Sequence, residues 1–530
     1  MMDRELSPLR GTALTLLLAA ALAISCLMPG AARAASVKPQ VILDRPLALA
    51  GEAKPFYVLV RFQVPEPTAA TTAKRAPLNI ALVLDRSGSM AEGGKLSYAK
   101  RAAKMVIDSL QPRDRLALVE YDEVVSVMWP SAPLETPAMI KRLINDLLPR
   151  GSTNLSGGMM QGAEQVRRHL DGEAINRVLL LSDGLANAGI TDPANIARMA
   201  REVRRAGIGI STLGLGLSYN EDLMQDIAEN AGGQYHYVEA PEQLAGIFRR
   251  ELQSLFQTVA RDVALVFEAA PAVRTVKVFG AAAESKHGRT LVALENFVAG
   301  EQRSLLLRLE TSPLILGQTA LGTLRLSYEE VNGKTRQQLA HEVTVQVSKA
   351  ENEVQKAANK EVDVEVAMVE AERRHTAALK TYQEDRPSEA RRQMQALAAD
   401  LAGRQAELGD VRLAKKIEAL RIEERQMQSV ATASASAPPQ TASAYLKASK
   451  QRLYQAKKGR RGSYLLREGD KGFEVERLQK ALTAAQVYSG PIDGTFGAEV
   501  GRAVKDYQQR QGITADGIAG PATMHELGIY

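Results

Sequence analysis

The sequence contains very little cysteine and few aromatic residues. Cys26 is the only cysteine and Trp129 the only tryptophan among 530 residues, and aromatic residues make up 5% of the chain. A disulfide within the chain and a zinc site built from cysteines both need more than one thiol, so both are excluded. If the N-terminal segment that carries Cys26 is removed, a thiol nucleophile is excluded as well.

Histidines and catalytic motifs are also sparse. None of the six histidines belongs to an H-E-x-x-H pattern, since "HEVTV" at residue 341 has no second histidine, and there is neither a G-x-S-x-G elbow nor a P-loop. Carboxylate pairs such as Glu120 and Asp122 are expected by chance among 61 acidic residues. The sequence therefore predicts a protein that is not an enzyme.

The charge pattern of the chain argues against the class of nucleic-acid-binding proteins. The formal net charge is +6 and the pI is near 9.1. No segment interleaves aromatic with basic residues as a nucleic-acid reader would, so we expect no nucleic-acid partner. The mild basic excess is compatible with an acidic partner.

One long apolar run lies at the N-terminus. "TALTLLLAAALAISCLM" is preceded by Arg4 and Arg10 and followed by the small residues around Ala34, which predicts a secretory signal peptide over residues 1–35. Two alternatives stay open: lipidation of Cys26, or an uncleaved membrane anchor over residues 11–32. Each of them predicts a protein of the bacterial periplasm or cell envelope.

Residues 77–259 alternate short apolar runs with amphipathic segments. The runs include "LNIALVLD", "RLALVEY", "NRVLLLSD" and "GIGISTLGLG". Nearly continuous apolar strands that alternate with helices are typical of a doubly wound, Rossmann-like α/β domain with a mostly parallel sheet. Ligands of such sheets bind at the carboxyl ends of the strands.

The flanking segments favour a second fold class. Residues 260–348 show strand-like alternation without helices, which predicts a β-sandwich. Residues 36–76 carry two more strand-like runs, and we expect them to pair with the later strands, so that the sandwich is discontinuous.

Three regions follow the predicted sandwich. Residues 350–428, rich in Ala, Glu, Lys, Arg and Gln, are expected to be helical. Residues 429–462 begin with "SVATASASAPPQTASA" and are interpreted as a flexible linker. Its basic run from 447 to 462 is either a solvated surface or an attraction to anionic wall or lipid.

The most specific signal is the loop after the first α/β strand. Asp85, Ser87 and Ser89 alternate where "LNIALVLD" ends, and Thr153 and Asp183 are expected at neighbouring strand ends. Carboxylate and hydroxyl oxygens suit a hard cation such as Mg²⁺. Two carboxylates only balance a divalent charge, so the ion could still attract a carboxylate from outside.

These five residues resemble the metal-ion-dependent adhesion site (MIDAS) of von Willebrand factor type A (VWA) domains, in the family's order. The resemblance implies that Ser87, Ser89 and Thr153 bind Mg²⁺ or another divalent cation directly. It implies that Asp85 and Asp183 act mainly through water. An acidic side chain of a protein partner would then fill the sixth position.

The C-terminal region, residues 463–530, contains a short repeat. "DGTFG" at 493 recurs as "DGIAG" at 516, each followed by a helix-like segment. With "LREGDKGFEVERLQKAL" and the Tyr-Gln pair at 507, the region resembles the small all-α peptidoglycan-binding domain of bacterial wall proteins. Which residues contact the wall is not assigned by the resemblance.

Together these features predict an exported, non-enzymatic envelope adaptor that binds a protein partner through a metal site and anchors to peptidoglycan. A membrane contact is expected only if the N-terminal segment is retained or lipidated. One alternative is a wall-remodelling enzyme, or its regulatory subunit, directed to the wall by the C-terminal domain. Another is a structural wall protein with a vestigial metal site.

Overall fold

The computed structural model describes residues 37–65, 75–331, 335–433, 440–458, 460–461, 466–470, 473–512 and 515–527. The predicted signal peptide, with its lipidation and anchor alternatives, lies outside these residues. Within them, no helix is both long and apolar enough to cross a membrane.

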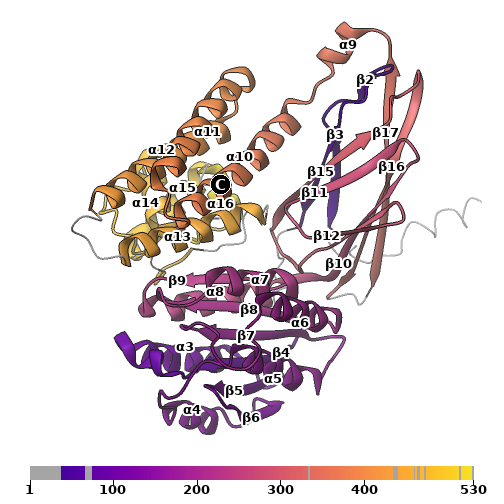
Figure 1. The fold of residues 1–530 in the computed structure, drawn as a ribbon. Helices are drawn as coiled ribbons and strands as arrows, with labels where there is room; N and C mark the ends of the chain where they lie inside the picture. Colours follow the sequence, from indigo (N-terminus) through magenta and orange to yellow (C-terminus); the bar gives the residue numbers. More distant parts are fainter. Residues whose placement is uncertain are drawn as a thin grey trace, which may run out of the picture. The chain divides into compact units, whose positions relative to one another are not determined.

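The α/β domain is a six-stranded sheet in the order β6-β5-β4-β7-β8-β9 (Figure 1). Only β6 runs antiparallel to its neighbour. The strands are β4 (Leu78–Asp85), β5 (Arg115–Tyr121), β6 (Val125–Pro133), β7 (Ile175–Ser182), β8 (Gly209–Leu215) and β9 (Tyr235–Val238). All eight residues of β4 are buried, as a central strand covered on both faces requires.

Two apolar layers cover this sheet. One contains α3 (Lys95–Ser109), α4 (Pro137–Asn145) and α8 (Leu244–Phe256), and the other contains α5 (Leu155–Arg167), α6 (Pro193–Arg205) and α7 (Glu221–Ala231). A Cβ atom at Gly162 of α5 would lie 2.5 Å from a methyl group of Val83, so glycine permits the close packing of α5 on β4. A short 3-10 helix, η1 (Gly88–Gly94), links β4 to α3, and η2 (Pro241–Gln243) precedes α8. The doubly wound prediction is confirmed.

A β-sandwich encloses a separate core. Its first sheet has the order β1-β3-β15-β11, and its second has the order β12-β13-β10-β16-β17-β2, with β14 beside β10. The strands are β1 (Lys38–Leu43), β2 (Leu47–Leu49), β3 (Phe56–Gln63), β10 (Thr258–Ala269), β11 (Val273–Phe279), β12 (Ala283–Lys286), β13 (Arg289–Ala293), β14 (Phe297–Val298), β15 (Gln302–Thr311), β16 (Gly317–Glu330) and β17 (Arg336–Ser348). Because β3 pairs with β15 from Phe56–Leu309 to Gln63–Gln302, the N-terminal strands belong to this sandwich.

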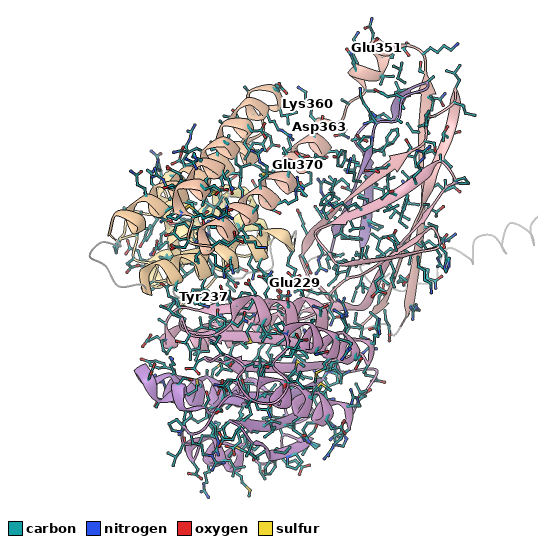
Figure 2. All side chains as sticks on the ribbon, viewed as in Figure 1. Glu229, Tyr237, Glu351, Lys360, Asp363 and Glu370 are labelled. Atoms are coloured by element: carbon teal, nitrogen blue, oxygen red, sulfur yellow. The ribbon has the colours of Figure 1, made fainter. Side chains whose placement is uncertain are left out.

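The next region is helical. It contains α9 (Glu351–Lys356), α10 (Lys360–Gln383), α11 (Pro387–Leu408), α12 (Val411–Ala433) and α13 (Gln440–Lys457), and α10 to α13 share one core. Glu370 of α10, labelled in Figure 2, accepts a hydrogen bond of 2.8 Å from Arg404 of α11. A buried pair, His375 and Glu423, lies 3.0 Å apart between α10 and α12.

The structure corrects the predicted linker at residues 429–462. Residues 440–457 form α13, and Tyr454 of this helix is 1% exposed within the core of the α/β domain. Its ring meets that of Tyr235 edge-on, with centroids 5.6 Å apart. Two lysines of the basic run, Lys447 and Lys450, pair with Glu221 at 2.5 and 3.0 Å. These two lysines are therefore neutralised inside the protein, and residues 440–458 are not a free tether, whereas residues 434–439, 459 and 462 of the predicted linker lie outside the described residues. A two-residue strand, β18 (Arg460–Arg461), then pairs with β15.

The C-terminal domain is small and all-α, as predicted. It contains α14 (Phe473–Ala484), α15 (Ala498–Arg510) and α16 (Pro521–Glu526) around one apolar core. Each Asp-Gly turn of the repeat is held by a glutamine of the preceding helix. Gln479 bonds to Asp493 Oδ1 and the N–H of Gly494 at 2.9 and 2.8 Å. Gln508 bonds to Asp516 Oδ1 and the N–H of Gly517, both at 2.9 Å. The two aspartates therefore stabilise turns.

The docking of α13 generates a prediction. Replacing Tyr454 with alanine should destabilise the α/β domain by about 3–5 kcal/mol, because it removes a buried aromatic ring. Tyr454→Phe should cost only about 1 kcal/mol, since it removes only the hydroxyl that accepts a 3.2 Å hydrogen bond from the N–H of Tyr235. Thermal unfolding and amide exchange of β9 measure both effects. Unchanged exchange of β9 in Tyr454→Ala would contradict the docking.

A second prediction concerns Asp44, just after β1. Burial raises the pKa of Asp44 to about 6, against the opposing effect of Arg45. The stability that this carboxyl contributes is thus fully present below its unfolded pKa near 3.8 and is lost as pH rises through about 6. Asp44→Asn should stabilise the sandwich at pH 8 by up to about 3 kcal/mol and have little effect at pH 4. Urea unfolding at both pH values, with amide exchange of β3 as the readout, tests this. An equal change in the free energy of unfolding at pH 4 and pH 8 would refute it.

Candidate functional site

All five residues predicted for the metal site lie together at the carboxyl edge of the α/β sheet. Asp85 ends β4, and Asp183 directly follows β7, the strand beside it. Ser87 lies on the loop after β4 and Ser89 lies in η1, and their hydroxyl oxygens are 3.2 Å apart. The hydroxyl of Ser89 donates a 2.7 Å hydrogen bond to Asp183 Oδ1.

Thr153 completes the group from the loop before α5. A Cβ atom built on Gly184 would lie 3.0 Å from the Thr153 hydroxyl oxygen and 3.5 Å from that of Ser89. The two hydroxyls therefore converge over Gly184, which leaves the space beside them open because it has no side chain. Ser89 thus lies beside Thr153 at Gly184 and contacts both Ser87 and Asp183.

The carboxylates are buried. Asp85 and Asp183 are both 0% exposed. Burial raises the pKa of Asp85 to about 6, although hydrogen bonds from Ser87 and Ser182 favour its charged form. The N–H of Ser87 donates to Asp85 Oδ1 at 2.8 Å, and the Ser182 hydroxyl donates to Oδ2 at 2.7 Å. A cation in the site would offset the cost of this burial.

The loops of the site are bonded to one another. Asp122, after β5, accepts hydrogen bonds from Arg86 and Arg150 at 2.9 and 2.8 Å. Burial favours its neutral form, but the bonds from Arg150, from the N–H of Val124 and from Arg86 outweigh burial and lower the pKa of Asp122. Asn187, on the loop after β7, accepts a 2.7 Å hydrogen bond from the N–H of Thr153, on the loop before α5. This bond ties the two loops together.

Sequence reasoning missed the supporting residues. Glu120 and Asp122 are not an acid–base pair, because both form ion pairs with Arg86. Ser182 and Lys95 were not singled out, yet Lys95 Nζ lies 2.7 Å from Asp183 Oδ2. The available signal for Ser182 was its position directly before Asp183. A further signal was the Asx residue before α5, α6 and α7: Asn154, Asp192 and Asn220 each accept a bond from a backbone N–H of the first turn.

The oxygens present fit a hard divalent cation. Mg²⁺ prefers oxygen ligands and retains some water, and the group offers carboxylates and hydroxyls without nitrogen or sulfur. Among the described residues, no group of three or more His, Cys, Asp or Glu side chains is arranged to hold a metal. The donor set of this site instead contains only two acids, so its remaining oxygens are neutral.

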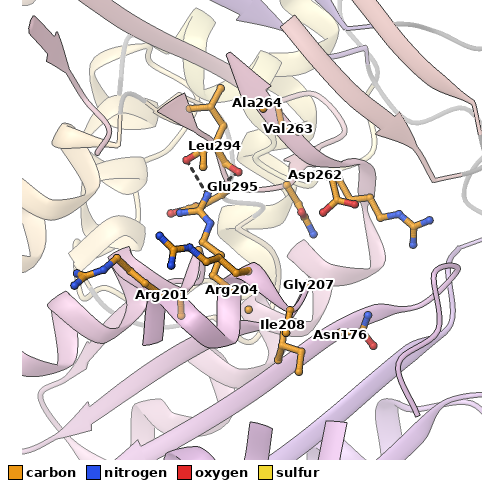
Figure 3. Close-up of a pocket in the computed structure, with 18 of the residues that line it drawn as sticks. Asn176, Arg201, Arg204, Gly207, Ile208, Asp262, Val263, Ala264, Leu294 and Glu295 are labelled. Carbon is orange, nitrogen blue, oxygen red and sulfur yellow. Dashed lines mark hydrogen bonds between the residues drawn. The ribbon is translucent and has the colours of Figure 1, made fainter. Parts of the chain in front are cut away.

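A cavity of about 610 Å³ lies elsewhere, between residues of α6 and of the sandwich strands (Figure 3). Arg204 of α6 donates hydrogen bonds of 2.7 and 2.9 Å to the carbonyl oxygens of Ala293 and Leu294 (Figure 3). Burial lowers the pKa of Arg204. Arginines and acidic residues both line the cavity, which gives it no single sign of charge.

Comparison with protein families identifies two domains. The model for the von Willebrand factor type A domain matches residues 79–250, and that for a putative peptidoglycan binding domain matches residues 471–527. These matches enclose the candidate metal site and the Asp-Gly repeat, respectively.

Similar curated proteins match only part of the chain. The uncharacterized protein YfbK of Escherichia coli (strain K12) is 33% identical over 195 residues, which cover 37% of this chain and 34% of that protein. The uncharacterized protein sll0103 of Synechocystis sp. is 28% identical over 274 residues, which cover 49% of this chain and 64% of that protein. The chain thus spans about a third and somewhat under two thirds of these two relatives.

Two solved structures share the fold. A von Willebrand factor type A protein from Catenulispora acidiphila has a TM-score of 0.58 at 18% identity. The matched region is 75% of this chain and 91% of that chain. The ArnB paralog VWA2 from Sulfolobus acidocaldarius has a TM-score of 0.51 at 15% identity. Here the matched region is 79% of this chain and 98% of that chain. At such identities the likeness concerns the fold alone. The chain is therefore a multidomain protein with a von Willebrand factor type A domain and a C-terminal peptidoglycan-binding domain.

Proposed function

We propose that this protein is an exported, non-enzymatic adaptor of the bacterial envelope. Its VWA domain binds a protein partner through a divalent cation, and its C-terminal domain holds peptidoglycan. The observation that carries the proposal is the convergence of five oxygen-bearing side chains at one edge of the sheet, in a chain that ends in a peptidoglycan-binding domain.

In this proposal Ser87, Ser89 and Thr153 hold Mg²⁺ directly, and Asp85 and Asp183 act mainly through water. The cation supplies a Lewis-acidic position for a carboxylate of the partner. The chain's own residues hold the ligand oxygens in place, because hydrogen bonds among the three loops restrain them before any ion binds.

Exposed apolar side chains near the site support a protein partner. Leu185 is 57% exposed and Ile190 is 46% exposed, and both lie on the loop that begins at Asp183. Val124, on the loop after Asp122, is 55% exposed. Protein interfaces commonly combine apolar contact area with a few precisely placed polar anchors. A carboxylate on a protein surface would meet both features here.

The metal site yields a direct test. Ser87→Ala combined with Ser89→Ala should weaken Mg²⁺ binding at least about tenfold, because it removes two of the three neutral oxygens from the site. Calorimetric titration of the full chain with Mg²⁺ measures the change. Ser152→Ala, an exposed serine beside Thr153, is the matched control and should bind Mg²⁺ as the natural chain does. Equal Mg²⁺ affinity in all three proteins would overturn the metal role.

The wall-binding half yields a separate test. The full chain should sediment with purified peptidoglycan sacculi equally well in Mg²⁺ and in EDTA, because the C-terminal domain has its own core and turns, apart from the metal site. A chain truncated after residue 461 should remain in the supernatant. Release of soluble wall fragments during the incubation would instead favour a wall-remodelling enzyme.

A further inference from the structure

Lys95 is a charged residue that the proposed metal site does not use. Its Nζ lies 2.7 Å from Asp183 Oδ2 and 3.5 Å from the carbonyl oxygen of Ser89. The other oxygen of Asp183 accepts the hydroxyl of Ser89. Since the side chain of Lys95 is 12% exposed and that of Asp183 is 0% exposed, water screens this ion pair weakly.

The position of Lys95 in its helix is unfavourable by itself. It is the first residue of α3, and a positive charge at a helix N-terminus opposes the helix dipole. Glu92 lies 3.8 Å away but is 77% exposed, so it contributes little. Asp183 is therefore the main compensating anion. Gly216 lies next to the lysine, since a Cβ atom built there would be in van der Waals contact with Lys95 Cε at 3.5 Å.

The formal charges of the site then have a definite sum. Asp85 and Asp183 contribute two negative charges, a divalent cation contributes two positive charges, and Ser87, Ser89 and Thr153 are neutral. The adjoining cluster of Arg86, Arg150, Glu120 and Asp122 also sums to zero. Counted over the ion, its five proposed ligands and Lys95, and leaving aside the exposed Glu92 and Glu123, the loaded site carries one net positive charge with Lys95 and none without it.

We infer that Lys95 sets the ligand specificity of this site: it makes the loaded site cationic, so that the site selects an anionic side chain, and it weakens binding of the metal alone. The inference rests on the proposed function. Both effects follow from one ammonium group beside a metal-site carboxylate, because that group repels a cation and attracts an anion.

The test uses Mn²⁺ as the ion and acetate as the probe carboxylate, each titrated into the full chain. Water-proton relaxation reports Mn²⁺ binding and then the loss of bound water as acetate enters. Lys95→Met should bind Mn²⁺ about tenfold more tightly and acetate about tenfold more weakly, within the usual range of coupling between two bound groups. These opposite changes distinguish the charge of Lys95 from a structural role, which would weaken both.

Three further variants complete the design. Lys95→Gln keeps a hydrogen-bond donor without the charge and should behave as Lys95→Met. If Lys95→Met does not fold, Lys95→Gln takes its place in the test. Lys95→Arg keeps the charge and should resemble the natural chain. Lys104→Met removes the same charge from a half-buried lysine of the same helix, bonded to Asn145, and should change neither affinity.

The outcomes separate the inference from the proposed function. If the natural chain binds Mn²⁺ and neither Lys95→Met nor Lys95→Gln shows the opposite shifts, the role of Lys95 is refuted while the metal site stands. If the natural chain binds no Mn²⁺, the proposed function itself fails, and the inference fails with it.

Discussion

The buried charge of two carboxylates is the constraint on which this part of the structure depends. Asp85 and Asp183 end adjacent parallel strands, where neither reaches solvent. A buried carboxylate is tolerated only with hydrogen bonds or a counter-charge. The N–H of Ser87, the hydroxyls of Ser182 and Ser89, and the ammonium of Lys95 supply these contacts. These donors hold both buried carboxylates in fixed positions at the edge of the sheet.

The sequence was sufficient to predict the edge of the sheet and the five oxygens on it. Parallel strands bring all their carboxyl ends to one edge, so Asp85 and Asp183 had to be neighbours once β4 and β7 were adjacent. It was not sufficient to predict Lys95. A lysine at the start of an amphipathic helix has the pattern of a solvated residue, and its burial follows only from where Asp183 lies after folding, 88 residues away. The ion pairs of Arg86 were missed for the same reason.

The error over α13 has a different physical cause. Alanine, serine and lysine are common in linkers, but alanine and lysine are also good helix formers, and composition alone does not separate the two states. Besides burying Tyr454, this helix covers the backbone edge of β9, an edge strand that in the described part of the chain otherwise lacks a partner on that side. The side chain of Gln451 accepts from the N–H of Tyr237 and donates to the carbonyl of Tyr235, at 3.2 and 3.3 Å. An amide side chain thus continues the hydrogen bonding of the sheet, and a sequence pattern gives no sign of it.

The same helix contacts a loop near the proposed metal site. Lys447 of α13 donates a 2.8 Å hydrogen bond to the carbonyl oxygen of Tyr219, in the loop after β8. That loop begins at Gly216, which packs against the stem of Lys95. A helix more than 200 residues further along the chain therefore restrains the loop beside the residue that balances Asp183. The family match, residues 79–250, therefore leaves out a helix that packs against this domain. Residues 440–457 pack as a part of this domain, because Gln451 bonds to the edge strand β9 and Lys447 bonds to the loop after β8.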